Sequence, residues 1–130
     1  MRLFVLALLV LAANVALAQK PAKLQGQALI DSLLKELPKQ KEDTNKANIL
    51  WGISFTYRII NPDEGINYGR QDSALAAKLH WKKGIASADN SLGVNYQMKD
   101  DYAGALQHFS LALQLFEEIG NKKSIGGSEQ

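Results

Sequence analysis

The sequence predicts an all-α protein built from pairs of antiparallel helices. After Pro21, apolar residues recur at helical spacing, and no stretch alternates apolar and polar residues for long, as a half-buried strand would. The turn signals are likewise spaced for helices. A short segment also recurs forty residues along the chain, at 81–85 and again at 121–125. Such a repeat of helix pairs is typical of an α-solenoid.

The first two helices are expected over about residues 24–38 and 45–60. Pro38 ends the leading helix because proline cannot continue the helical hydrogen bonds. A polar connector follows, in which either Asp43 or Thr44 can cap the second helix with its side-chain oxygen.

The third helix is expected over about residues 61–79, and its start carries several agreeing signals. Asn61 is a favourable N-cap, and Pro62 fits the first helical position. Glu64 can reach back to the N-cap as in a capping box.

The fourth and fifth helices are expected over about residues 85–98 and 102–119. Residues 80–84 are expected to link the third helix to the fourth. Asp100 suits the next turn because aspartate tolerates the left-handed backbone. Gly120 is expected to close the fifth helix as a C′ residue.

Composition fits one small folded domain that is held together by packing alone. The chain has 130 residues, of which 46% are hydrophobic and 22% charged. It has no cysteine, which excludes disulfides, thiolate metal sites and a cysteine nucleophile. The formal net charge is +2, which gives no reason to expect a nucleic-acid partner.

Residues 1–18 have the order of a secretory signal peptide. Arg2 precedes a short apolar run, and Ala16 and Ala18 offer an A-x-A cleavage site. The chain is therefore expected to be exported, and to be periplasmic or secreted after cleavage near Ala18. A retained N-terminal anchor helix is the alternative.

The later helix pair resembles the tetratricopeptide repeat. Its L-G-x-x-Y…A-x-x-x-F spacing occurs once, and a further alanine fits the pattern three residues on. The resemblance implies a right-handed α-solenoid in which small residues let two helices approach closely. The residues expected to form this packing signature are Leu92, Gly93, Tyr96, Ala105, Phe109 and Ala112.

The earlier helix pair matches the same pattern less closely. Ser54 stands where Gly93 would be expected, and Asp72 stands opposite Ala112. Within the later pair, Asp89 and Glu117 replace the Trp and Pro that the family often has. The expected organisation is a signal peptide at 1–18, a linker and leading helix at 19–41, a degenerate helix pair at 42–80, a repeat pair at 81–120, and a truncated third repeat or disordered tail at 121–130.

A more particular resemblance is to the exported N-terminal region of bacterial sensor histidine kinases and related signalling proteins. It rests on residues 31–34, 61–65 and 81–86. In those proteins, repeats precede a transmembrane helix and a signalling module. Residues 121–125 begin a third unit that the chain does not complete, and two units are fewer than a solenoid normally needs. The chain is therefore expected to be a fragment or a prematurely ended version of a longer protein, with a membrane contact only through a missing C-terminal part. A complete small helical bundle is the alternative.

A partner-binding groove is expected on the first helix of each pair, as the resemblance implies for the concave surface. On the second helix, one face groups polar and aromatic side chains away from the apolar face. Trp51 and Phe55 have an alternative role, packing beneath the leading helix as core. The eight groove candidates are Asn48, Trp51, Phe55, Arg58, Ser87, Asn90, Val94 and Gln97.

The sequence offers no motif for catalysis, for a metal or for a cofactor. His80 and His108 are far apart and lack a paired ligand at helical spacing. The Lys82–Lys83 and Lys122–Lys123 pairs are either solvated linker charge or a basic stripe for an acidic partner or membrane. The expected function is therefore a non-catalytic module that binds a protein or peptide outside the cytoplasm, as the sensing part of a receptor. A structural segment that self-associates through its open C-terminal end is the first alternative, and an exported enzyme subunit is the second.

Overall fold

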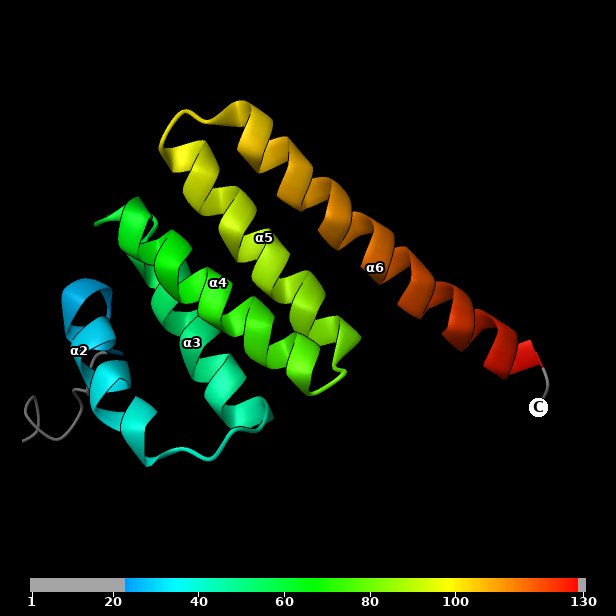
Figure 1. Ribbon diagram of the computed structural model, residues 1–130, viewed down its shortest axis with the longest axis horizontal. Coiled ribbons are helices and arrows are strands. Elements are labelled where there is room, and N and C mark those ends of the chain that lie inside the picture. The colour runs from blue at the N-terminus through cyan, green and yellow to red at the C-terminus, as the bar shows by residue number, and fades with distance from the viewer. Residues whose placement is uncertain (1–22, 129–130) are drawn as a thin grey trace, which may run out of the picture.

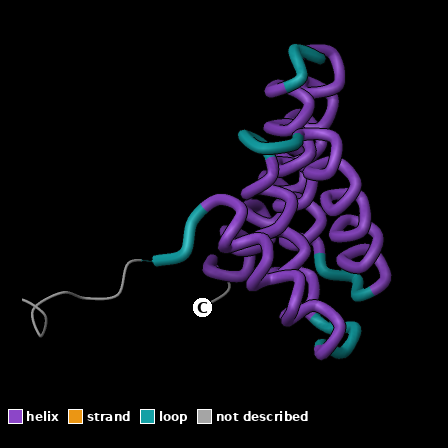
Figure 2. The backbone as a smooth tube through the Cα atoms, turned by 90° about the vertical axis from the view of Figure 1, so that its left-hand side faces the viewer, coloured by secondary structure: helices purple, strands orange, loops and turns teal. Residues whose placement is uncertain are grey.

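The computed structural model describes residues 23–128, and this part of the chain is all-α (Figure 2). The predicted export signal at 1–18 lies outside the described residues. The helices are α2 (Gly26–Glu36), the short 3-10 turn η1 (Leu37–Lys39), α3 (Thr44–Tyr57), α4 (Pro62–Lys78), α5 (Lys82–Met98) and α6 (Tyr102–Ser128). The predicted all-α class is confirmed for the described residues.

Each helix packs against the next one along the chain, and α3 also packs against α5 (Figure 1). Helix α3 is therefore central, with α2, α4 and α5 around it. Ile30 on α2 and Ile53 on α3 are both fully buried. The far part of α6 extends beyond the end of α5, as its red end in Figure 1 shows.

The last three helices start at a regular twenty-residue interval, at Pro62, Lys82 and Tyr102. The two turns between them use the same backbone device. His80 has φ 52° and Asp100 has φ 60°, so each turn places a non-glycine residue in the left-handed region. In both turns the next residue donates its backbone N–H to a carbonyl five residues earlier, at 2.9 Å. The predicted left-handed backbone at Asp100 is confirmed. The same conformation at His80 was not predicted from the sequence.

The helix caps agree with the sequence in part. Asp43 Oδ1 accepts a hydrogen bond from the backbone N–H of Lys46 at 3.1 Å, so Asp43 and not Thr44 caps α3. Asn61 caps α4 by accepting from the N–H of Glu64 at 3.3 Å. The predicted capping box is wrong, because the Asn61 N–H bonds instead to the carbonyl of Tyr57 at 2.8 Å.

Two predicted helix boundaries are also wrong. Helix α6 continues through Gly120, which therefore does not terminate it. Helix α5 starts at Lys82, so Lys82, Lys83 and Gly84 form its first turn and not a linker. Glycine at position 84 lets the Trp81 ring pack against the first turn of α5, because a Cβ there would lie 2.1 Å from that ring.

We expect Gly120→Ala to raise the free energy of unfolding by up to about 1 kcal/mol, because alanine favours a helix interior over glycine. No heavy atom lies within 4 Å of a Cβ built there, so the new methyl group meets no obstacle. Urea denaturation of the two proteins measures the difference. A loss of stability would contradict the prediction, and would indicate that Gly120 has a left-handed backbone at the end of the helix.

Candidate functional site

Two adjoining pockets lie between α3 and α5, with volumes of about 220 Å³ and about 110 Å³. Both are walled by Trp51 of α3 and Ser87 of α5. Six of the eight predicted groove residues line one or both pockets: Asn48, Trp51, Phe55, Ser87, Asn90 and Val94. Arg58 and Gln97 line neither. We call the surface formed by these two pockets the α3–α5 groove.

Stacked aromatic rings form the α3 wall of the groove. The Trp51 and Phe55 ring centroids are 5.1 Å apart and their planes differ by 8°. Trp51 is 37% exposed, so it is not enclosed beneath the leading helix. Helix α2 instead approaches the neighbouring position, where a Cβ on Gly52 would lie 3.2 Å from Leu33. The α3 wall is therefore an apolar surface that faces α5.

Arg58 closes one end of this aromatic stack. Its guanidinium carbon lies 3.8 Å from the centroid of the Phe55 ring, within the range of a cation–π contact. Its Nη1 donates a hydrogen bond to the carbonyl of Phe55 at 2.6 Å. These contacts hold Phe55 in place, and the predicted contact of Arg58 with a partner stays a prediction.

The larger pocket also reaches two residues that the groove prediction missed. Asp72 comes from α4, and Trp81 comes from the turn before α5. Asp72 is only 2% exposed, and its Oδ2 atom has no hydrogen-bond partner among the described residues. Burial raises the pKa of this carboxyl group from 3.8 to about 7, because an apolar site disfavours the charged form.

A buried polar network lies behind the groove and connects three helices. The Ser54 hydroxyl of α3 donates to the carbonyl of Gly65 on α4 at 2.7 Å, and lies 2.6 Å from the Ser91 hydroxyl of α5. The Asn95 amide donates to the carbonyl of Ser54 at 3.1 Å and to that of Ser91 at 2.9 Å. These bonds fix the spacing of α3 and α5, and with it the width of the groove.

The residues of the predicted packing signature lie on α5 and α6. Leu92, Ala105 and Ala112 are buried, and Leu92 lies against α4, where a Cβ on Gly69 would be 2.8 Å from its side chain. A Cβ on Gly93 would lie 2.7 Å from the ring of Phe109, so the two helices approach closely at this glycine.

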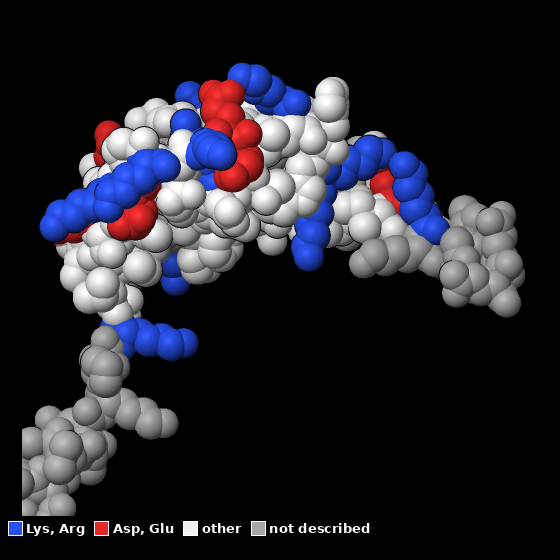
Figure 3. Space-filling model, turned by 90° about the horizontal axis from the view of Figure 1, so that it is seen from below, with Lys and Arg blue, Asp and Glu red and all other residues white. Residues whose placement is uncertain are grey.

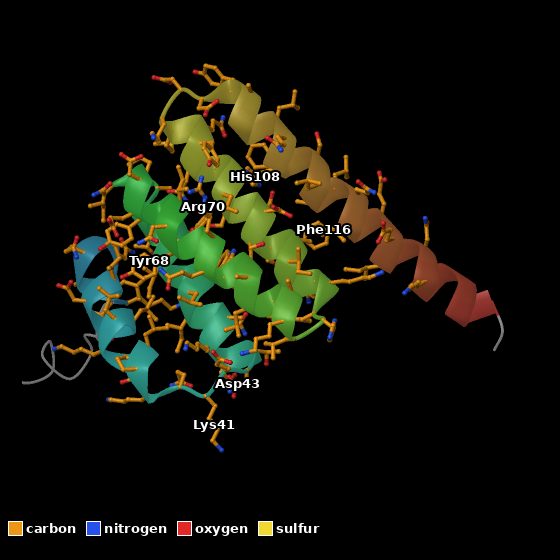
Figure 4. The ribbon with its side chains drawn as sticks, in the orientation of Figure 1. Lys41, Asp43, Tyr68, Arg70, His108 and Phe116 are labelled. Carbon is orange, nitrogen blue, oxygen red and sulfur yellow. The ribbon has the colours of Figure 1, made fainter. Side chains whose placement is uncertain are left out.

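Tyr96 of α5 contacts side chains of both neighbouring helices, α4 and α6. The Tyr96 ring stacks on His108, with centroids 5.3 Å apart, and its hydroxyl accepts a hydrogen bond from Arg70 at 2.8 Å. His108, labelled on α6 in Figure 4, has its Nδ1 2.9 Å from Asp89 Oδ1. Asp89, at the position where the resemblance leads one to expect tryptophan, is thus a buried partner for His108.

A corresponding ring stack occurs in the earlier helix pair, thirty-nine and forty residues before Tyr96 and His108. Tyr57 and Tyr68 stack with centroids 5.9 Å apart, at positions that correspond to Tyr96 and His108. The two helix pairs therefore share an equivalent contact as well as a sequence pattern.

The remaining surface gives weaker indications of a ligand. A further pocket, of about 290 Å³, lies between α3 and α4, but its Glu42 and Lys78 already form an ion pair. Lys82 lies 3.5 Å from Glu118, and both side chains are partly exposed. The basic stripe stays a prediction. Charged side chains gather along one edge of the arched molecule in Figure 3, and the opposite edge is mostly uncharged. Residues 23–128 hold no group of three acidic or histidine side chains placed to bind a metal ion.

Comparisons of this chain with protein-family models, curated proteins and solved structures found no match. None of the described helices has the length and apolar character needed to cross a membrane. The candidate site therefore stands on its own geometry.

Proposed function

We propose that this chain is a non-catalytic module that binds a peptide segment of a partner protein in the α3–α5 groove. In this account α3–α6 are a short right-handed tetratricopeptide-like solenoid. The observation that carries the proposal is the partly exposed Trp51–Phe55 stack, which faces α5 across two open pockets. Exposed aromatic side chains beside polar ones are typical of protein-binding surfaces.

The groove offers both apolar contact area and hydrogen-bonding groups for a bound peptide. The Trp51 and Phe55 rings supply apolar area for a partner side chain. Asn48 and Asn90 are both exposed, and their amides can pair with the backbone N–H and C=O groups of an extended peptide. The Ser54–Ser91–Asn95 network stabilises the groove in advance, which lowers the entropy cost of binding.

We place this activity outside the cytoplasm, as the sensing part of a signalling receptor. The support is the signal-like pattern of residues 1–18 and the resemblance to exported sensor regions. No cofactor takes part in the proposed binding.

Selection of peptides from a random phage-displayed library tests the proposal. The selected peptides should bind the chain, and Asn90→Tyr should weaken that binding at least about tenfold by filling the smaller pocket. Gln114→Tyr is the matched control, because Gln114 is exposed on α6 and lines neither pocket. A library that yields no binder, or peptides that bind Asn90→Tyr as well as the parent, would contradict the proposal.

A specific observation favours self-association as a second candidate function. Leu106 and Leu113 of α6 are 68% and 59% exposed, on one helical face. Ile66, forty residues before Leu106, is only 7% exposed. A helix packed on α6 as α5 packs on α4 would bury this face.

We expect this second function to show as a mass that rises with protein concentration in light scattering. Leu106→Glu should then keep the chain monomeric, because a buried unpaired carboxylate is costly in an apolar interface. A monomeric mass for the parent chain at all concentrations would contradict self-association and leave the groove proposal untouched.

A further inference from the structure

The larger pocket of the groove has an unusual floor. Asp72 of α4 lines it together with residues of α3 and α5, and this residue is 2% exposed. Its Oδ2 atom has no hydrogen-bond partner among the side chains and backbone that the structure describes. A buried carboxylate is normally paired or hydrogen-bonded, because water otherwise solvates it far better than protein does.

A cation would supply the partner that Asp72 lacks. The ion pairs of the described residues use other acids, namely Glu36, Glu42, Glu118, Asp63 and Asp89. The cause of the raised pKa of Asp72 is burial, so no described lysine or arginine compensates its charge. A positive group that enters the pocket would restore the missing partner and hold Asp72 in its charged form.

The walls of the pocket suit an organic cation. Trp51 and Trp81 both line it, and tryptophan is the aromatic side chain that binds cations best through its ring face. The volume of about 220 Å³ lies below the range typical of drug-sized ligands, roughly 300–1,000 Å³, and suits a single side chain. The remaining polar groups, the Asn48 amide and the Ser87 hydroxyl, can accept hydrogen bonds from an ammonium or guanidinium group.

We propose that the Asp72 pocket binds the side-chain ammonium or guanidinium group of a lysine or arginine in the bound peptide. This inference rests on the peptide-binding function and names the residue class that the groove selects. The apolar part of the basic side chain lies against the tryptophan rings, and its charged end reaches the Asp72 carboxylate.

The chain carries its own probe for this test. Its two tryptophans are Trp51 and Trp81, and both line the pocket, so their fluorescence reports on its occupancy. Titration with N-acetyl-lysine amide should change the emission in a saturable way, whereas N-acetyl-norleucine amide, which lacks the charge, should not. Equal responses to the two compounds would overturn the proposal without the need for any variant.

Asp72→Asn tests the role of the carboxylate. We expect it to weaken binding of N-acetyl-lysine amide at least about tenfold. Asp89→Asn is the matched control, because Asp89 is also buried but pairs with His108 and does not line the pocket. Unchanged binding by Asp72→Asn would overturn the proposal.

Peptides selected on the groove separate this inference from the function on which it rests. They should contain lysine or arginine, and replacing that residue by norleucine should weaken binding about as much as Asp72→Asn does. Peptides that bind through Asn90 but carry no basic residue would overturn the cation site and leave the peptide groove in place. Free putrescine that binds as tightly as the basic peptides would assign the site to small amines and overturn the peptide as their source.

Discussion

Replacing Ile53 by alanine is expected to lower the free energy of unfolding by about 2–5 kcal/mol. Ile53 is fully buried in α3, the helix that contacts α2, α4 and α5. The substitution would leave a cavity in the protein interior, and the helices packed around α3 can collapse onto it only in part. Urea denaturation followed by circular dichroism measures the loss.

Ile59→Ala is the matched control for this prediction. Ile59 lies just beyond α3 and is 66% exposed, so its substitution should change stability by less than about 0.5 kcal/mol. Similar losses for the two variants would contradict the central position of α3.

Asp72→Asn is expected to stabilise the unliganded chain at alkaline pH. The pKa of Asp72 rises from 3.8 to about 7 on folding, because burial disfavours its charged form. Folding therefore takes up a proton between these two pH values, and the wild-type chain loses stability as the pH rises from about 4 through about 7. The neutral amide of asparagine does not incur this loss.

The size of this effect depends on pH. A change in pKa of that extent corresponds to at most about 4 kcal/mol, so Asp72→Asn should gain about 2–4 kcal/mol near pH 8 and little near pH 4. Asp31→Asn, on the exposed surface of α2, is the control and should show no such gain. A gain that is the same at both pH values would contradict the burial of an ionisable Asp72.

The helices could be predicted from local sequence because their signals are local. Asp43 and Asn61 cap helices with their own side chains, and Asp100 forms its turn with its own backbone. The helix end predicted at Gly120 is wrong. Glycine often follows the last residue of a helix, but α6 continues through Gly120. His80 was missed because histidine is not a usual left-handed residue.

The candidate site could be predicted only where it lies on one face of one helix. Helical spacing brings Trp51 and Phe55 together on α3, and a shift of thirty-nine residues transfers this face to Asn90 and Val94 on α5. Asp72 could not be placed in this way, because it enters the pocket from a different helix and through tertiary packing. The one sequence signal for Asp72 was its position, because an acid stands there where the later helix pair has Ala112.

The central claim is that the partner lies in the α3–α5 groove, and an NMR titration of the ¹⁵N-labelled chain with a selected peptide tests it most directly. We predict shifts of the Trp51 indole and of the amides of Ser87, Asn90 and Val94. Shifts confined to Leu106 and Leu113 on the exposed face of α6 would contradict the claim.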